Sequence, residues 1–132
     1  MIELENEFVQ FWVVDGILYS KYTKTVNFDV NLLKQLIEIR HTISNNVGQY
    51  WCYNAKEAKS FPKECRDYAD VYGQEFLFAT AVIINSHIQK FLFNAYLKLK
   101  KPKIPLLAFT NTEKAVEWLT ALKLQNKDCL TI

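Results

Sequence analysis

The residues that decide the fold are Pro105-Leu-Leu-Ala-Phe-Thr-Asn-Thr-Glu-Lys-Ala-Val-Glu-Trp-Leu119. The apolar run from Ile104 to Phe109 predicts a strand. Thr110 followed by Glu113 has the spacing of a capping box, in which two side chains bind free N–H groups at a helix start. The helix is expected to bury Ala115, Trp118, Leu119 and Leu122, and the tail after Lys123 is expected to fray. A strand followed at once by a helix completes an alternation that runs through most of the chain.

The alternation begins with a predicted β-hairpin. Residues 8–14 are rich in aromatic and β-branched types, as are residues 17–22. Asp15-Gly16 lies between them, and glycine tolerates the positive φ that a two-residue hairpin turn requires. We therefore interpret Asp15 and Gly16 as structural residues.

A helix and a strand are predicted next. Asn27 and Asp29 are both candidate N-caps. The apolar residues of the helix recur at helical spacing: Leu32, Leu33, Leu36, Ile37 and Ile43. Residues 45–48, Asn-Asn-Val-Gly, are typical of a helix end, and residues 49–53 predict a short strand. Together with the hairpin, this segment indicates a βαβ unit.

A second, short helix is predicted between Ser60 and Gly73. Ser60 and Pro62 indicate its start, because serine accepts a first-turn N–H bond and proline lacks the N–H that would be unpaired there. Gly73 indicates its end. Its inner face is expected to hold Cys65, Tyr68, Ala69 and Tyr72.

Residues 76–84, Phe-Leu-Phe-Ala-Thr-Ala-Val-Ile-Ile, do not alternate between polar and apolar types, so we expect a central strand covered on both sides. Asn85 or Ser86 caps the next helix. Its apolar stripe consists of Ile88, Phe91, Leu92, Ala95 and Leu99. The expected fold class is α/β, a single domain over residues 1–132 with a mixed five-stranded sheet and about four flanking helices.

The composition of the chain argues against several classes of partner and location, beginning with those that need a strong charge excess. Lys and Arg total 16 against 14 Asp and Glu, a balance that favours neither nucleic acid nor an anionic membrane as the main partner. The acidic start of the chain lacks the basic residues and apolar run of a secretory signal, so we expect a cytoplasmic protein. The longest apolar stretch is less than half of the roughly 20 residues that a membrane-spanning helix needs. Stable membrane insertion is therefore not expected.

Chemistry-bearing residues are few. Cys52, Cys65 and Cys129 form no CxxC pair, which suits reduced, buried or incidental thiols. His41 and His87 have no cysteine or carboxylate at ligand spacing. No nucleophile elbow, P-loop or dinucleotide motif occurs. We expect no metal, no cofactor and no catalytic residue.

The order of these segments resembles that of the SpoIIAA-like, or STAS-like, bacterial domains of mostly unassigned function. Besides the final strand and helix, the resemblance rests on Lys59-Ser60, Cys65-Arg66-Asp67-Tyr68, Ala79 to Ile84, Ser86, Asn94 and Lys101-Pro102. It implies a mixed sheet flanked by helices, and a relation to anti-sigma-factor antagonists and to lipid-binding CRAL-TRIO domains. In the antagonists a phosphorylatable serine follows an aspartate at a helix N-terminus; here the loop from Asn54 to Ser60 lacks that pair.

Three residues form the candidate partner- or anion-binding site: Lys56, Ser60 and Arg66. Phosphorylation of Ser60 would add a charge of about −2 beside nearby lysines, whereas the alternative is a plain N-cap. The resemblance places Arg66 near Ser60; its alternative role is an exposed helix-face charge. A separate basic patch, either a phosphate or acidic-partner contact or a solvated connector, consists of Lys98, Lys100, Lys101 and Lys103.

The leading hypothesis is a non-enzymatic binding or regulatory domain that contacts a protein partner, or a second copy of itself, through an amphipathic helix. The alternative is a carrier of a small apolar, lipid-like ligand, as in the CRAL-TRIO relation. That alternative requires a cavity between the sheet and the stripe formed by Ile88, Phe91, Leu92 and Ala95. An enzyme is the last choice.

Overall fold

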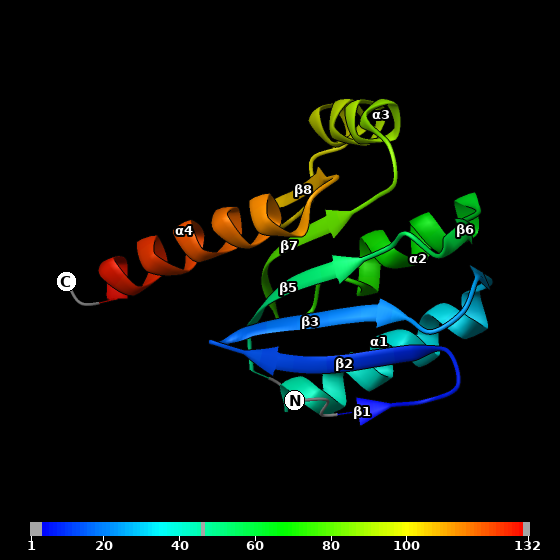
Figure 1. Cartoon of the computed structure of the whole chain (residues 1–132), viewed down its shortest axis with the longest axis horizontal. Coiled ribbons are helices and arrows are strands. Elements are labelled where there is room, and N and C mark those ends of the chain that lie inside the picture. The colour runs from blue at the N-terminus through cyan, green and yellow to red at the C-terminus, as the bar shows by residue number, and fades with distance from the viewer. Residues whose placement is uncertain (1–3, 46, 131–132) are drawn as a thin grey trace.

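The computed structural model describes residues 4–45 and 47–130, the last four by their backbone alone. A six-stranded sheet has the order β1-β2-β3-β5-β7-β8 (Figure 1). Its strands are β1 (Leu4–Glu5), β2 (Val9–Val14), β3 (Ile17–Tyr22), β5 (Gln49–Asn54), β7 (Leu77–Ile83) and β8 (Leu106–Phe109). A separate parallel pair joins β4 (Val26–Asn27) to β6 (Ala58–Ser60). The helices are α1 (Val30–Ser44), α2 (Lys63–Tyr72), α3 (His87–Leu99) and α4 (Thr112–Leu130).

The predicted α/β class with a mixed sheet is confirmed, although the sheet has one strand more than expected. The additional strand is β1, which pairs antiparallel with β2 at the edge. β3, β5, β7 and β8 are mutually parallel. Each crossover moves one strand in the same direction, so right-handed connections place α1, α2 and α3 on one face of the sheet. α4 covers the other face (Figure 1).

The predicted hairpin turn is present between β2 and β3. Asp15 has φ 52° and Gly16 has φ 77°. Two consecutive positive φ angles give a turn whose twist matches that of the flanking strands. The Asp-Gly sequence therefore has the structural role assigned to it.

The capping of α1 also follows the sequence. Asp29 is the N-cap, and its carboxylate accepts a bond of 2.8 Å from the N–H of Leu32. Asn45 ends the helix in the left-handed conformation, with φ 52°. Leu33, Leu36 and Ile37 are buried in the core between α1 and the sheet.

The predicted start of α2 at Ser60 is wrong. Ser60 lies in β6, where backbone pairing with β4 holds it in an extended conformation. Pro62 is the N-cap residue, and no side chain caps this end. Gly73 ends the helix as predicted, but only Cys65 of the expected inner face is fully buried, and Tyr72 is exposed.

The run predicted as a central strand forms β7, which lies beside the edge strand β8 rather than in the middle of the sheet. A register shift near the start of β7 separates Phe78, whose side chain is half exposed, from the residues that follow. Beyond it, Ala79, Ala81 and Ile83 pack against Ala115 and Leu119 of α4. This contact forms the second part of the core.

Two further helix predictions need correction. α4 begins after Asn111, whose side chain accepts from the N–H of Lys114, so Thr110 is not its cap. α4 also stays helical to Leu130, whereas the chain beyond Lys123 was expected to fray. Its C-terminal end extends beyond the strand ends, on the side of the β2–β3 turn (Figure 1).

The orientation of α3 differs most from the prediction. Ser86 caps the helix as expected, accepting from the N–H of Gln89. The apolar stripe is nevertheless exposed to solvent, and no residue of α3 is fully buried. Asn94 sets this orientation, since its amide accepts from the N–H of Ala108 (2.8 Å) and donates to the carbonyl of the same residue (3.3 Å). These bonds attach α3 to the edge strand β8.

Candidate functional site

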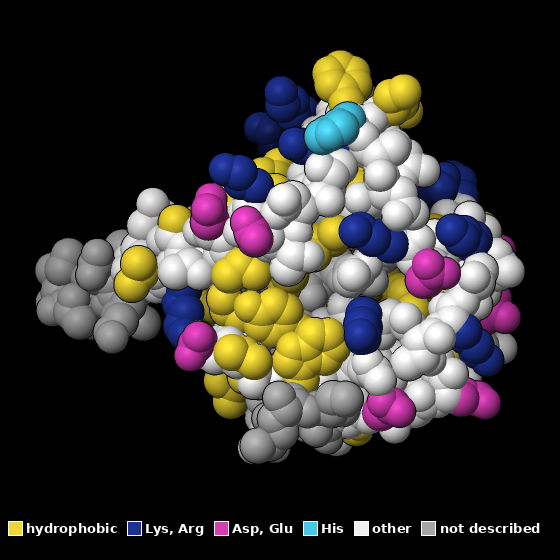
Figure 2. Space-filling model, viewed as in Figure 1, with side chains coloured by type: hydrophobic (Ala, Val, Ile, Leu, Met, Phe, Trp, Pro, Cys, Tyr) yellow, Lys and Arg dark blue, Asp and Glu magenta, His cyan; other side chains and the backbone are white. Residues whose placement is uncertain are grey.

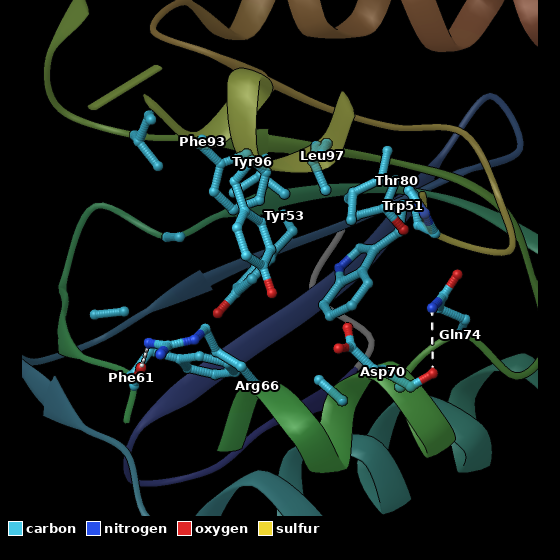
Figure 3. A pocket seen from close by; sticks show the side chains of 18 of the residues that line it. Trp51, Tyr53, Phe61, Arg66, Asp70, Gln74, Thr80, Phe93, Tyr96 and Leu97 are labelled. Atoms are coloured by element: carbon cyan, nitrogen blue, oxygen red, sulfur yellow. Dashed lines mark hydrogen bonds between the residues drawn. The ribbon is translucent and has the colours of Figure 1, made fainter. Parts of the chain in front are cut away.

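A cavity of about 550 Å³ lies on the face of the sheet that carries α2 and α3. β5, β7 and β8 form its floor, and the two helices form its walls. Figure 3 shows Arg66 and Phe61 toward one end and Gln74 toward the other. Cavities of roughly 300–1,000 Å³ are typical of small-molecule sites.

The lining is mainly apolar and aromatic. Strands contribute Trp51, Tyr53, Leu77, Val82 and Leu106, and helices and loops contribute Phe61, Ala69, Phe93, Tyr96, Leu97 and Ile104. Phe93 and Leu97 are four residues apart, so they project from the same face of α3 toward the floor. This face is opposite to the stripe that was expected to meet the sheet.

Hydrogen bonds and ring contacts fix the aromatic floor. The indole N–H of Trp51 donates to the hydroxyl of Ser20 over 2.9 Å, and both groups are buried. The ring of Trp51 stacks on that of Tyr53, with centroids 4.7 Å apart. The hydroxyls of Tyr53 and Tyr22 share a hydrogen bond of 2.5 Å. Burial raises the pKa of Tyr53 to about 12, so this hydroxyl is neutral at physiological pH.

Thr80 lines the cavity, but its hydroxyl oxygen is itself buried, and it has no hydrogen-bond partner among the described residues. Its side chain lies on the floor beside Trp51 (Figure 3), and Thr80 is only 4% exposed. A buried hydroxyl without a partner costs about 1–3 kcal/mol. The Thr80 hydroxyl therefore lowers the stability of the ligand-free protein.

One end of the cavity is cationic. Lys56, Lys59 and Arg66 line it. Arg66 donates to the carbonyl of Phe61 over 3.1 Å, and in the part of the chain that the structure covers no carboxylate forms an ion pair with any of these three cations. Their positive charge is consequently available to an anionic group.

The other end is closed by polar contacts between elements. Lys100, at the end of α3, forms an ion pair of 3.1 Å with Asp70 of α2. That bond raises the pKa of Lys100. The amide oxygen of Gln74 accepts from the N–H groups of Lys103 and Ile104, at 2.8 and 3.1 Å. These side chains connect α2 to α3 and to the segment before β8.

The structure brings together two of the three residues predicted as a site. Lys56 and Arg66 both line the cavity. Ser60 does not: it is exposed in β6, and its hydroxyl donates to the side chain of Asn27 over 3.2 Å. Ser60 is therefore not an N-cap at the site.

His41, His87, Cys52 and Cys65 are not among the residues that line the cavity. Among the described residues, no three His, Cys, Asp or Glu side chains lie close enough together to hold a metal. Cys52 and Cys65 are buried free thiols. The side chain of Cys129 lies outside the described residues.

A family model described as a domain of unknown function, DUF7793, matches residues 11–123. The chain belongs to the DUF7793 family. The match spans β2 to most of α4 and includes every residue of the cavity. No curated protein matches the chain.

The fold of this DUF7793 chain is similar to that of an uncharacterised DUF3478-family protein with a SpoIIAA-like fold from Shewanella loihica PV-4. The crystal structure of that protein aligns with a TM-score of 0.57 and 11% sequence identity, covering 90% of this chain and 99% of the other. The predicted SpoIIAA-like resemblance is thereby confirmed at the level of the fold. In the described part of the chain, no helix has the length and apolar character to cross a membrane.

Several cavity residues were missed in the sequence. Thr80 could have been singled out from the sequence, because it is the single polar residue in the apolar run from Phe76 to Ile84. Phe93 and Leu97 were overlooked because the stripe on the opposite face of α3 contains more apolar residues. The pairing of Trp51 with Ser20 joins residues 31 positions apart, which no local pattern indicates.

Proposed function

We propose that this protein is a non-enzymatic binding domain that holds one small, mainly apolar molecule between α2, α3 and the sheet. The observation that carries the proposal is the cavity of about 550 Å³, lined mainly by apolar and aromatic side chains. Burying apolar ligand surface there would contribute roughly 25 cal/mol per Å². This proposal corresponds to the alternative considered from the sequence, with the other face of α3 as the wall.

The polar groups of the cavity restrict the ligand further. Lys56, Lys59 and Arg66 at one end favour a molecule with a carboxylate or another anionic group, and a guanidinium can bind a carboxylate through two N–H groups. The best candidate is an anionic amphiphile of modest size.

The polar side chains around the cavity are bonded to other parts of the protein, which favours a binding role over catalysis. Tyr53 is bonded to Tyr22, and Gln74 to the backbone at Lys103 and Ile104. Asp70 is engaged with Lys100. These groups connect structural elements, so they are poorly placed to act as an acid, a base or a nucleophile.

Regulation through a protein partner or a second copy, the leading hypothesis from the sequence, stays a prediction. One observation favours a contact surface: Val14, Phe78 and Leu124, on or near the α4 face of the sheet, are 42%, 50% and 57% exposed. Figure 2 shows apolar side chains gathered below α4 on this face. We treat this surface as secondary to the cavity.

Titration calorimetry with probes of equal chain length tests the ligand class. Decanoate and 1-decanol differ only in the head group, so we expect decanoate to bind more tightly, with one site per chain. Arg66→Gln should weaken decanoate binding about tenfold and leave decanol unchanged, because it removes one charge-assisted interaction. Lys24→Gln, at an exposed position that does not line the cavity, is the matched control. Equal affinities in all three proteins would contradict the anionic preference, and the absence of saturable binding would contradict the function.

A further inference from the structure

The outer face of α3 exposes large apolar side chains along the whole helix. Ile88, Phe91, Leu92 and Leu99 are 73%, 72%, 60% and 90% exposed. α3 lies at the edge of the molecule, beyond β7 and β8 (Figure 1), and apolar side chains protrude there beside basic ones (Figure 2). Contiguous exposed apolar surface of this kind indicates an interaction site.

Charge is strongly segregated around this helix. No Asp or Glu occurs between Glu75 and Glu113, and that segment holds five lysines: Lys90, Lys98, Lys100, Lys101 and Lys103. The near-neutral balance of the whole chain conceals this local excess. The segment that contains α3, residues 76–112, therefore has basic side chains but no acidic ones.

We propose that the outer face of α3 docks on the surface of an anionic lipid bilayer. An interfacial helix inserts its apolar face at the boundary between head groups and acyl chains, while flanking lysines bind anionic head groups. Two copies meeting through this face would bring Lys90 and Lys98 of each copy together without a carboxylate from α3 to compensate them, which disfavours self-association. A protruding single helix also suits an extended surface better than a groove.

Other contacts of α3 are compatible with this role. The bonds from Asn94 to Ala108 and the ion pair between Lys100 and Asp70 hold the inner side of the helix to the protein. A shallow hollow of about 410 Å³ on α3 is lined by His87, Lys90, Phe91, Asn94, Ala95 and Lys98. Its basic rim beside an apolar floor suits an anionic head group. The docking does not depend on a ligand in the cavity.

Vesicle co-sedimentation of the full chain tests the proposal. Vesicles made of equal parts of phosphatidylcholine and phosphatidylglycerol should bind the protein, and vesicles of phosphatidylcholine alone should bind it far less. Raising the ionic strength from about 0.1 M to about 1 M shortens the Debye length from about 10 Å to about 3 Å and should weaken binding severalfold.

Paired variants separate the apolar and charged contributions. Leu92→Ser should lower the partition coefficient at least about fivefold by removing an inserted side chain. Leu124→Ser, on α4, removes an equally exposed leucine and should have no effect. Lys98→Gln should lower binding about fivefold, whereas Lys24→Gln should not.

Three results would overturn the proposal. One is equal binding to both kinds of vesicle, which would show no anionic preference. Another is no binding to either. The third is a stable dimer of the wild-type protein that Leu92→Ser converts to a monomer, which would make this face a contact between two copies. Far-UV circular dichroism of each variant verifies that it is folded.

Discussion

The guanidinium carbon of Arg40 lies 5.3 Å from the centroid of the Trp51 ring. Trp51 forms part of the cavity floor. Arg40 is only 1% exposed, and it donates to the carbonyls of Glu75 (2.9 Å) and Gly73 (3.2 Å) at the end of α2. Burial lowers the pKa of Arg40 to about 10. Within the described residues no carboxylate forms an ion pair with it, so carbonyl oxygens and an aromatic face hold this cation.

Arg40→Met should lower the free energy of unfolding by about 2–3 kcal/mol. Methionine fills much of the space but leaves two carbonyls without donors and removes the contact with Trp51. Urea denaturation followed by circular dichroism measures the loss. The matched control is Arg66→Met, at an exposed site, which should change stability by less than about 0.5 kcal/mol. Equal losses in both variants would mean that Arg40 contributes no more than a surface arginine.

Thr80→Val should raise the free energy of unfolding of the empty protein by about 1 kcal/mol. The substitution removes a buried hydroxyl without a partner and keeps the side chain nearly the same size. Urea denaturation of ligand-free protein measures the change. Thr80→Ser keeps the hydroxyl and serves as the control. A loss of stability specific to Thr80→Val would show that the hydroxyl has a bonding partner in the empty protein.

The protein should lose stability between about pH 9 and pH 11, in part through Cys52. Burial raises the pKa of this thiol from 9.0 to about 11. Over this range the unfolded chain releases the proton while the folded chain largely keeps it, so the free energy of unfolding falls by about 2 kcal/mol between about pH 9 and pH 11. Unfolding free energies measured by urea denaturation at several pH values give the slope.

Cys52→Ala should make the fall of the unfolding free energy with pH less steep between about pH 9 and pH 11. Cys65→Ala is a useful comparison, because burial also raises the pKa of Cys65. If the slope of Cys52→Ala equals that of the wild type, the thiol does not contribute to the alkaline loss.

The hairpin and the first helix follow directly from the sequence, since Asp15-Gly16 and Asp29 act within a few residues of themselves. Ser60 shows the limit of such patterns. It is a good N-cap by type, but Phe28 N–H donates to its carbonyl, and the strand containing it pairs with Val26–Asn27, over 30 residues earlier in the chain. Pairing with a distant strand therefore holds Ser60 in an extended conformation.

The orientation of α3 could not be predicted for a related reason. The helix has apolar residues on two faces, and helical periodicity does not say which one meets the sheet. Asn94 is bonded to the edge strand, and Phe93 and Leu97 consequently turn toward the cavity. Leu92 and Leu99, in the stronger stripe, are left in solvent. The cationic end of the cavity was partly predicted, through Lys56 and Arg66.

The most direct test of the cavity is native mass spectrometry of the full chain incubated with decanoate. Wild-type protein should retain one decanoate per chain. Ala69→Phe fills space between α2 and the floor and should abolish the bound mass, whereas Ala121→Phe, the same change at an exposed position of α4, should retain it. If Ala69→Phe binds decanoate as the wild type does, or if the wild type carries none, the cavity does not bind this class of ligand.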